Sequence, residues 1–171
     1  MALIQVQFYS QSLMRQVDVQ VLLPNDSQDW MTKDNPHYDR PMRTLTLLHG
    51  YSGSHRDWLI NSRIQELSGR YHLAVIMPSG ENSFYLDQAG TGNAYGTFVG
   101  KELPAYISQM FGLSPLPEHH FICGLSMGGF GAIHVGVSHP EQFSKIAALS
   151  SALIVHGIKE MVPGTGNQFA D

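Results

Sequence analysis

The chain has 171 residues, of which 43% are hydrophobic and 14% are charged, and its formal net charge is −4. This length predicts a single domain, residues 1–171, with a substantial core, and the composition excludes a disordered chain. No run of basic or acidic residues marks a surface for nucleic acid or for an anionic membrane. The N-terminal residues lack a basic region followed by an apolar stretch, so we expect a cytoplasmic protein without a membrane segment.

Two segments near the N-terminus alternate apolar and polar residues, a pattern that is typical of half-buried antiparallel strands. They are Leu3–Tyr9 and Val17–Leu23, and the short connection between them predicts a hairpin. The segment from Pro24 to Pro41 is polar and rich in Asn, Asp and Pro, which predicts a surface loop.

The rest of the chain alternates continuous apolar runs with helical patterns. We expect strands at 45–48, 73–77, 121–124 and 146–149 and helices around 60–71, 99–110 and 128–137. Pro104 either begins the regular part of the second helix or kinks it. This order predicts an α/β fold with a mostly parallel central sheet and helices on both faces.

A Gly-x-Ser-x-Gly sequence connects the third of these strands to the following helix. It places Ser126 between Gly124 and Gly128. Such a turn exposes the serine hydroxyl and leaves no room for a Cβ atom on either side. The alternative is a Gly-rich turn with an incidental serine, but the strand-turn-helix setting favours a nucleophile. Ser126 is therefore the predicted nucleophile.

A serine that attacks a carbonyl group needs hydrogen-bond donors for the oxyanion that forms, and backbone N–H groups can supply them. One donor is predicted at Met127, at the start of the helix, where the helix dipole also favours negative charge. The second is predicted at Tyr51, because Gly50 lets the backbone turn after the strand that ends at Leu48. We expect His49 to be structural rather than catalytic.

None of the histidines near the motif in sequence is an evident general base for Ser126. His134 is eight residues further along the helix, which corresponds to roughly 12 Å along its axis. His139 is farther still, and residues 119–120 enter the strand from its opposite end. His156 lies in a segment whose path the sequence does not indicate.

Other polar and aromatic residues have expected roles around this site. Asp87 is expected to fix a loop rather than to act as the catalytic acid, and the glycine-rich residues 90–96 are expected to form a flexible loop near the site. The pocket walls are expected to include Tyr85, Tyr95 or Trp58, and Cys123 is expected to be a buried free thiol. No metal or cofactor is expected, because the histidines lack partners at ligand spacing and no phosphate-binding motif is complete.

Several ordered motifs resemble the esterase D-like α/β-hydrolases, and within that group the bacterial tributyrin esterases. The resemblance runs from Leu3 to about Leu153 and is carried by residues 48–58, 77–80, 82–87, 124–132 and 139–143. It implies the α/β-hydrolase fold, a small-molecule acyl ester as substrate, and hydrolysis of short-chain esters by a Ser-His-Asp triad. Feruloyl or acetylxylan esterases and S-formylglutathione hydrolases share these motifs and are the substrate variants.

Members of this family carry a later strand that ends in an Asp, followed by a loop that bears a His, and residues 150–171 match neither. We therefore expect a hydrolase fold that lacks its C-terminal strands, with the catalytic acid and base outside this chain. Asp171 comes too early to be that acid. The alternative is a truncated, non-catalytic core that binds a ligand or a partner chain, and its exposed sheet edge would favour self-association into a homo-oligomer.

Overall fold

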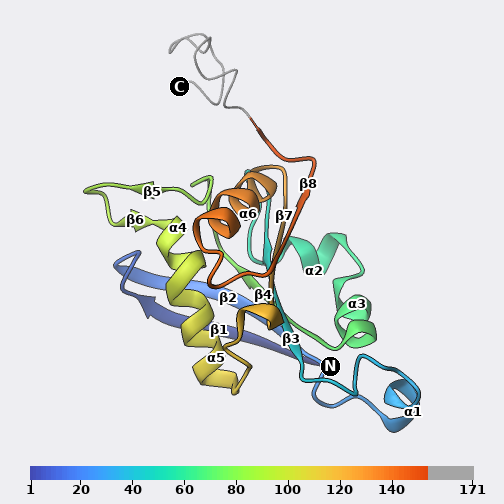
Figure 1. Cartoon of the computed structure of the whole chain (residues 1–171). Helices are drawn as coiled ribbons and strands as arrows, with labels where there is room; N and C mark the ends of the chain where they lie inside the picture. The colour runs from blue at the N-terminus through green and yellow to red at the C-terminus, as the bar shows by residue number, and fades with distance from the viewer. Residues whose placement is uncertain (154–171) are drawn as a thin grey trace.

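The structure, a computed structural model, describes residues 1–153 except for the side chain of Met31. The described residues form a six-stranded sheet with the strand order β1-β2-β4-β3-β7-β8 (Figure 1). In that order along the sheet, its strands are Ala2–Ser10, Arg15–Leu23, Leu73–Pro78, Arg43–Leu48, His120–Leu125 and Lys145–Leu149. All of the strands expected from the sequence are therefore confirmed.

The direction of the strands decides which ends meet at one edge of the sheet. β3 pairs in parallel with both β4 and β7, and β7 pairs in parallel with β8. β1 and β2 form the predicted antiparallel hairpin, and β2 is antiparallel to β4. The carboxyl ends of β3, β4, β7 and β8 thus lie at the same edge as the first residues of β2.

Helices cover both faces of the sheet, as the sequence predicts. One face carries α2 (Asp57–Asn61) and α3 (Ile64–Tyr71). The elements on the other face are α4 (Tyr95–Thr97), the π-helical turn η1 (Phe98–Glu102), α5 (Leu103–Phe111) and α6 (Met127–Ser138). The short helices α1 (Asp29–Thr32) and η2 (Pro117–His119) lie in connections. No helix within the described residues has the length and apolar character to span a bilayer.

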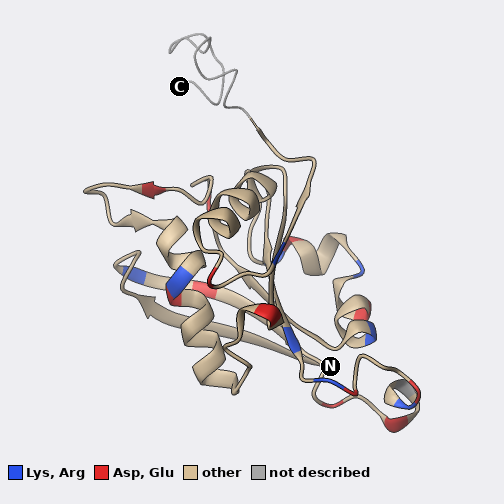
Figure 2. Ribbon diagram, viewed as in Figure 1, with Lys and Arg blue, Asp and Glu red and all other residues tan. Residues whose placement is uncertain are grey.

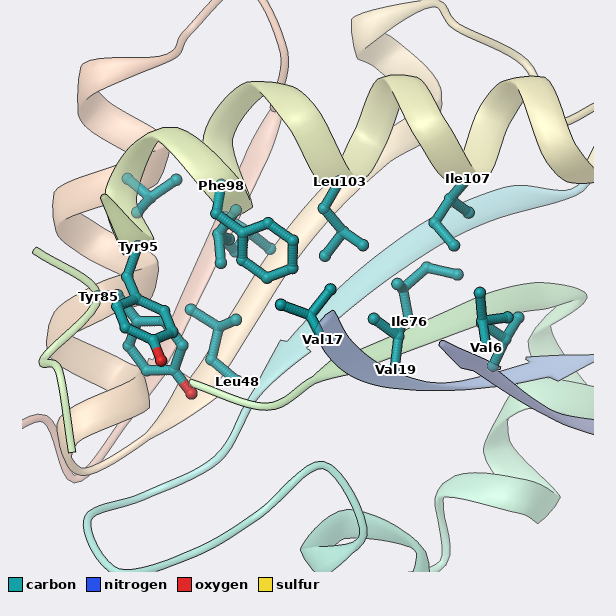
Figure 3. Close-up of a cluster of buried hydrophobic side chains, with 14 of the residues drawn as sticks. Val6, Val17, Val19, Leu48, Ile76, Tyr85, Tyr95, Phe98, Leu103 and Ile107 are labelled. Carbon is teal, nitrogen blue, oxygen red and sulfur yellow. The ribbon is translucent and has the colours of Figure 1, made fainter. Parts of the chain in front are cut away.

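The two faces of the sheet have separate cores because successive side chains of a strand point to opposite sides. In β4, Ala74 and Ile76 belong to the larger core, which packs under α5 and α6. Val75 and Met77 belong to the smaller core, which includes Ile64 of α3. Figure 3 shows the larger core, with the side chains of the η1–α5 segment directed toward those of β2 and β4.

The first helical segment differs from the expectation of one continuous helix over 60–71. Ser62 has an extended backbone, with φ −145° and ψ 173°, and it separates α2 from α3. Ile60 is 70% exposed although its spacing predicted a buried position. The break rotates α2 relative to α3. Of the apolar residues spaced along 60–71, Ile64 is the one that is buried in the core.

The second helical segment begins its regular part near Pro104, in the first turn of α5, which directly continues the π-helical turn η1. The preceding turn η1 carries Glu102, whose carboxylate accepts hydrogen bonds from the hairpin connection between β1 and β2. The donors are Ser10 Oγ at 2.7 Å, the Gln11 N–H at 2.7 Å and the Ser12 N–H at 3.0 Å. This contact ties the hairpin to the helical layer.

Candidate active site

Ser126 lies at the junction between β7 and α6 in a strained backbone conformation, with φ 55° and ψ −114°. Such a conformation costs about 1–3 kcal/mol and persists only where surrounding contacts fix it. Here the Ser126 N–H donates to the Leu149 carbonyl at 2.9 Å. The Ser126 carbonyl accepts from the N–H groups of Phe130 and Ala152, both at 3.0 Å. The end of β8 and the first turn of α6 therefore hold the serine in place.

The glycines on both sides of Ser126 are required by close backbone approaches. A Cβ atom on Gly124 would lie 2.1 Å from the Gly128 carbonyl oxygen. A Cβ atom on Gly128 would lie 2.4 Å from the carbonyl oxygen of Leu48 and 2.6 Å from that of His49. The expectation that this turn has no room for Cβ atoms is confirmed, and α6 consequently packs directly on the end of β3.

Neither β7 nor α6 contains a Lys, Arg, Asp or Glu residue (Figure 2). The helix is buried along the side that contacts the sheet, including Met127, Ala132 and Val135. The position of Ser126 therefore depends on apolar packing and on backbone hydrogen bonds rather than on ion pairs.

The loop after β3 passes close to Ser126. A Cβ atom on Gly50 would lie 3.6 Å from the Ser126 Cβ atom and 3.5 Å from the Leu125 carbonyl oxygen. Tyr51, which follows directly, therefore has its backbone beside the nucleophile. On the other side of Ser126, Met127 begins α6, and the first N–H groups of a helix have no acceptor within that helix. The two sequence-predicted donors thus flank the same serine.

His49 is buried and fixes this loop. Its Nε2 atom accepts a hydrogen bond from the Gly80 N–H at 2.8 Å, so Nδ1 carries the proton and donates to the Gly50 carbonyl at 2.7 Å. Burial lowers the pKa of His49 below its ordinary value, which keeps the imidazole neutral. Both ring nitrogens are engaged by the backbone, and His49 is structural, as expected.

The three aromatic residues expected as pocket walls are held by contacts with the core and with the loop after β3. Tyr85 is fully buried, and its hydroxyl donates to the His49 carbonyl at 3.1 Å. Burial raises the pKa of Tyr85, so its hydroxyl stays protonated. Tyr95 is also buried, and the Trp58 indole donates to the Leu48 carbonyl at 3.0 Å. The pocket-wall expectation is wrong for Tyr85, because the turn that precedes it directs the ring into the core.

Two other aromatic rings lie close to the nucleophile, and sequence patterns did not single them out. The Phe84 ring is 6.0 Å from that of Tyr51 and 5.9 Å from that of Phe130, measured between centroids. Phe130 lies one helical turn after Ser126, and this spacing is the one signal that could have identified it. Phe84 has φ 53° in an irregular loop, which no periodic pattern predicts.

The histidines considered as a general base lie elsewhere. His120 is buried at the start of β7, the end opposite Ser126, where its Nε2 contacts the Ser114 carbonyl at 2.5 Å. His119 Nδ1 contacts the Ser114 hydroxyl at 2.7 Å. His134 is exposed and stacks on Phe130, and His139 contacts Glu141 at 3.2 Å. The structure therefore brings none of these four imidazoles to the nucleophile.

Four further residues named in the sequence analysis are Asp87, Cys123, His156 and Asp171, and the structure describes the first two. Asp87 accepts hydrogen bonds from the N–H and the hydroxyl of Thr97, at 2.9 and 2.6 Å, so its loop-fixing role is confirmed. Cys123 is half-buried in the smaller core, and burial raises its pKa. His156 and Asp171 lie outside the described residues. Within residues 1–153, no group of three or more His, Cys, Asp or Glu could hold a metal ion.

The model of the family described as "Putative esterase" matches residues 10–161. The chain belongs to this esterase family. The acetyl esterase of Caldicellulosiruptor saccharolyticus is 42% identical to it over 170 residues, which is 99% of this chain and 64% of that protein. The resemblance to esterases seen in the sequence is thus confirmed.

Solved structures of serine hydrolases are also similar to this chain. The fluorophosphonate-binding serine hydrolase FphF of Staphylococcus aureus superposes with a TM-score of 0.74 at 31% identity, covering 88% of this chain and 57% of that chain. The S-formylglutathione hydrolase FrmB of the same organism gives a TM-score of 0.76 at 29% identity, covering 94% of this chain and 61% of that one. The fold is therefore that of the α/β-hydrolases, and the chain spans less than two thirds of the length of these relatives.

Proposed function

We propose that this chain supplies the nucleophile and the oxyanion hole of a serine carboxylesterase that hydrolyses short-chain acyl esters. The observation that carries this proposal is the strained Ser126 at the β7–α6 junction, with the Gly50–Tyr51 backbone directly beside it. Strain of this kind is characteristic of functional sites. The match to the esterase family supports the same reaction class.

In the proposed reaction, Ser126 Oγ attacks the ester carbonyl carbon and transfers its proton to a general base. The oxyanion of the tetrahedral intermediate accepts hydrogen bonds from the N–H groups of Met127 and Tyr51. The carbon–oxygen bond to the alcohol then breaks, the base returns the proton to the departing alcohol, and an acyl-enzyme remains. Water attacks this acyl group by the same steps and releases the acid. We propose that the histidine and the acid of the triad lie outside this chain.

The proposed preference for short acyl chains comes from the aromatic rings around the nucleophile. The partly buried ring of Phe84 lies near those of Tyr51, which directly follows Gly50, and of Phe130, four residues after Ser126. We propose that these rings form an apolar wall that limits the length of the acyl group. The 42% identity to an acetyl esterase supports this preference. Tributyrin as a substrate, a single domain over residues 1–171, a cytoplasmic location and self-association stay predictions.

A second candidate function is a non-catalytic core that binds a partner chain. Within the described residues 1–153, β8 (Lys145–Leu149) is the last strand of the sheet and is exposed, and a later strand of the kind that family members carry would cover this edge. An exposed apolar edge strand is a template for pairing with another chain. The four imidazoles of His119, His120, His134 and His139 contact other groups than Ser126. A non-catalytic core is consistent with this, because it needs no general base at Ser126.

The two candidates differ in the hydrolysis of p-nitrophenyl butyrate by the product of the full reading frame that contains this chain. The esterase proposal expects turnover in the wild type and a loss of about 10³-fold or more in Ser126→Ala. Ser138→Ala, at the exposed end of α6, is the matched control and should retain turnover. Turnover that survives Ser126→Ala would contradict the proposal, and a folded wild type without turnover would favour the non-catalytic core.

A further inference from the structure

The loop after β3, which carries Tyr51, contains a strained tight turn. The Gly53 N–H donates to the Gly50 carbonyl at 3.1 Å and closes a β-turn. Tyr51 and Ser52 occupy its two central positions, and Ser52 has φ 61° whereas Tyr51 has a negative φ. These signs are those of a type II turn, whose second central position favours Gly or Asn because a Cβ atom is disfavoured there. Since Ser52 has a Cβ atom, a contact from outside the turn is needed to favour this conformation.

Asn82 supplies such a contact. Its Oδ1 atom accepts a hydrogen bond from the Ser52 N–H at 2.8 Å. The peptide group between the two central residues of a turn points in opposite directions in the type II and type I forms. The Ser52 N–H belongs to this peptide group, so a change to the type I form would turn it away from Asn82 and break the bond. The bond therefore favours one orientation of the peptide group that directly follows Tyr51.

Asn82 is itself part of a second tight turn, in the neighbouring loop. β3 and β4 are parallel neighbours, so the loops after them meet at one edge of the sheet. The loop after β4 leads to the small hairpin of β5 (Asp87–Gln88) and β6 (Asn93–Ala94). Within this loop, the Gly80 carbonyl accepts hydrogen bonds from the Ser83 N–H at 3.3 Å and from the Ser83 hydroxyl at 2.6 Å. These bonds enclose Asn82 in a closed turn and limit the movement of its side chain.

The two loops are joined on both sides of Tyr51. On its N-terminal side, the Gly80 N–H donates to His49 Nε2 at 2.8 Å, and the Tyr85 hydroxyl donates to the His49 carbonyl at 3.1 Å. On its C-terminal side, Asn82 binds the residue that directly follows it. His49 and Tyr85 are buried, whereas Asn82 is exposed. The Asn82 contact can therefore be removed without opening the core.

We propose that Asn82 is a positioning residue for the oxyanion hole, which holds the turn after β3 in the form that directs the Tyr51 N–H to the oxyanion. This inference rests on the proposed esterase function and adds a residue that acts through Ser52 rather than on the substrate. Donors stabilise an oxyanion most when their positions are fixed before the charge develops, because they then need no reorganisation during the reaction. Asn82 supplies this fixed position on the C-terminal side of Tyr51.

The test uses a pair of substrates that reports on the oxyanion hole itself. With the product of the full reading frame, p-nitrophenyl butyrate is compared with its thionoester, in which sulfur replaces the carbonyl oxygen. Sulfur is a weak hydrogen-bond acceptor, so the thionoester gains less from the oxyanion donors. The ratio of kcat/KM for the ester to kcat/KM for the thionoester therefore measures what these donors contribute, and a general loss of active protein cancels. Asn82→Ala should lower this ratio about three- to tenfold, through kcat of the oxygen ester rather than through its KM.

Two further variants isolate the role of the Oδ1 acceptor. Asn82→Asp keeps an acceptor for the Ser52 N–H, and its added charge acts on the anionic intermediates of both esters, so the ratio should stay within about twofold of the wild type. Asn35→Ala is the matched control, because Asn35 Oδ1 likewise accepts a backbone N–H, that of His37, at 3.0 Å. Asn35 also binds the Arg70 carbonyl, just before the start of β4 and away from the candidate active site. This control should leave the ratio unchanged.

The outcomes separate the positioning role from the proposed function. A ratio within about twofold of the wild type in Asn82→Ala, or an equal fall in Asn82→Ala and Asn82→Asp, would overturn the positioning role even where Ser126→Ala abolishes turnover. Turnover that persists in Ser126→Ala, or a folded wild type without turnover, would instead contradict the esterase function on which the inference rests.

Discussion

Gly128→Ala places one methyl group where the first turn of α6 meets the end of β3. The added Cβ atom would lie 2.4 Å from the Leu48 carbonyl oxygen, 2.6 Å from that of His49 and 2.7 Å from the Leu48 carbonyl carbon. All three atoms belong to the backbone, so no side chain can rotate away. The whole helix or the strand end must move.

The expected cost follows from two opposing effects. Overpacking a closely packed core costs about 1–3 kcal/mol, and a rigid backbone contact favours the upper end of that range. Replacing Gly by Ala within a helix recovers about 1 kcal/mol. The net loss of unfolding free energy should therefore be about 2 kcal/mol, which for a chain of this length lowers Tm by about 4–8 °C.

Thermal and urea denaturation of Gly128→Ala, followed by circular dichroism, measure this loss. The control is Gly112→Ala, because Gly112 has φ 64° and an added Cβ atom there meets nothing within 4 Å. That control should lose only the cost of a left-handed backbone, about 1–2 kcal/mol, and should leave esterase turnover unchanged. If Gly128→Ala matched the wild type in both stability and turnover, the close contact between α6 and β3 would be refuted.

Two further predictions concern pH and stability. Burial opposes ionisation of Glu102, but the hydrogen bonds from Ser12, Ser10 and Gln11 outweigh it and hold the Glu102 pKa below its ordinary value. Its contribution to stability is therefore complete above about pH 4.3 and is lost as the pH falls through the lower folded-state pKa. Glu102→Gln should lower the unfolding free energy by about 1 kcal/mol at pH 7 and should weaken the loss of stability in acid. Urea titrations from pH 3 to pH 7 measure both effects. An acid dependence equal to that of the wild type would contradict this role of Glu102. Burial lowers the pKa of His49, so stability should fall as the pH drops below about 6.5, where the unfolded chain takes up the proton. His49→Asn should reduce that dependence without removing it, because burial also lowers the pKa of His72 and of His120. It should also cost about 1–3 kcal/mol by leaving the Gly80 N–H without its acceptor. Equal slopes of stability against pH between pH 5.5 and pH 7.5 in the two proteins would refute the buried neutral imidazole.

Local sequence patterns were sufficient to predict the strands of the sheet and the turn that carries Ser126. Apolar runs mark buried parallel strands, and the alternation of Leu3–Tyr9 marks a strand with one exposed face, so both kinds of strand were predicted. The environment of Ser126 was also predictable, because the requirement for Gly124 and Gly128 follows from the geometry of the turn itself.

The contacts that hold the site together depend on tertiary structure and were not predictable in the same way. The bond from Gly80 to His49 joins residues 31 positions apart, and the carboxylate of Glu102 reaches a hairpin about 90 residues away. The break at Ser62 also escaped prediction, because the apolar spacing of residues 60–71 continued through it. A periodic pattern reports which positions are apolar, whereas a single extended residue changes which of them face the core.

The central claim, that Ser126 is the nucleophile, is tested most directly by trapping its acyl-enzyme. The product of the full reading frame is mixed with p-nitrophenyl butyrate, quenched in acid within the first turnovers, digested and analysed by mass spectrometry. The account predicts a butyryl group on the peptide that contains Ser126 and none in Ser126→Ala. A butyryl group on a different residue, or full turnover by Ser126→Ala, would contradict it.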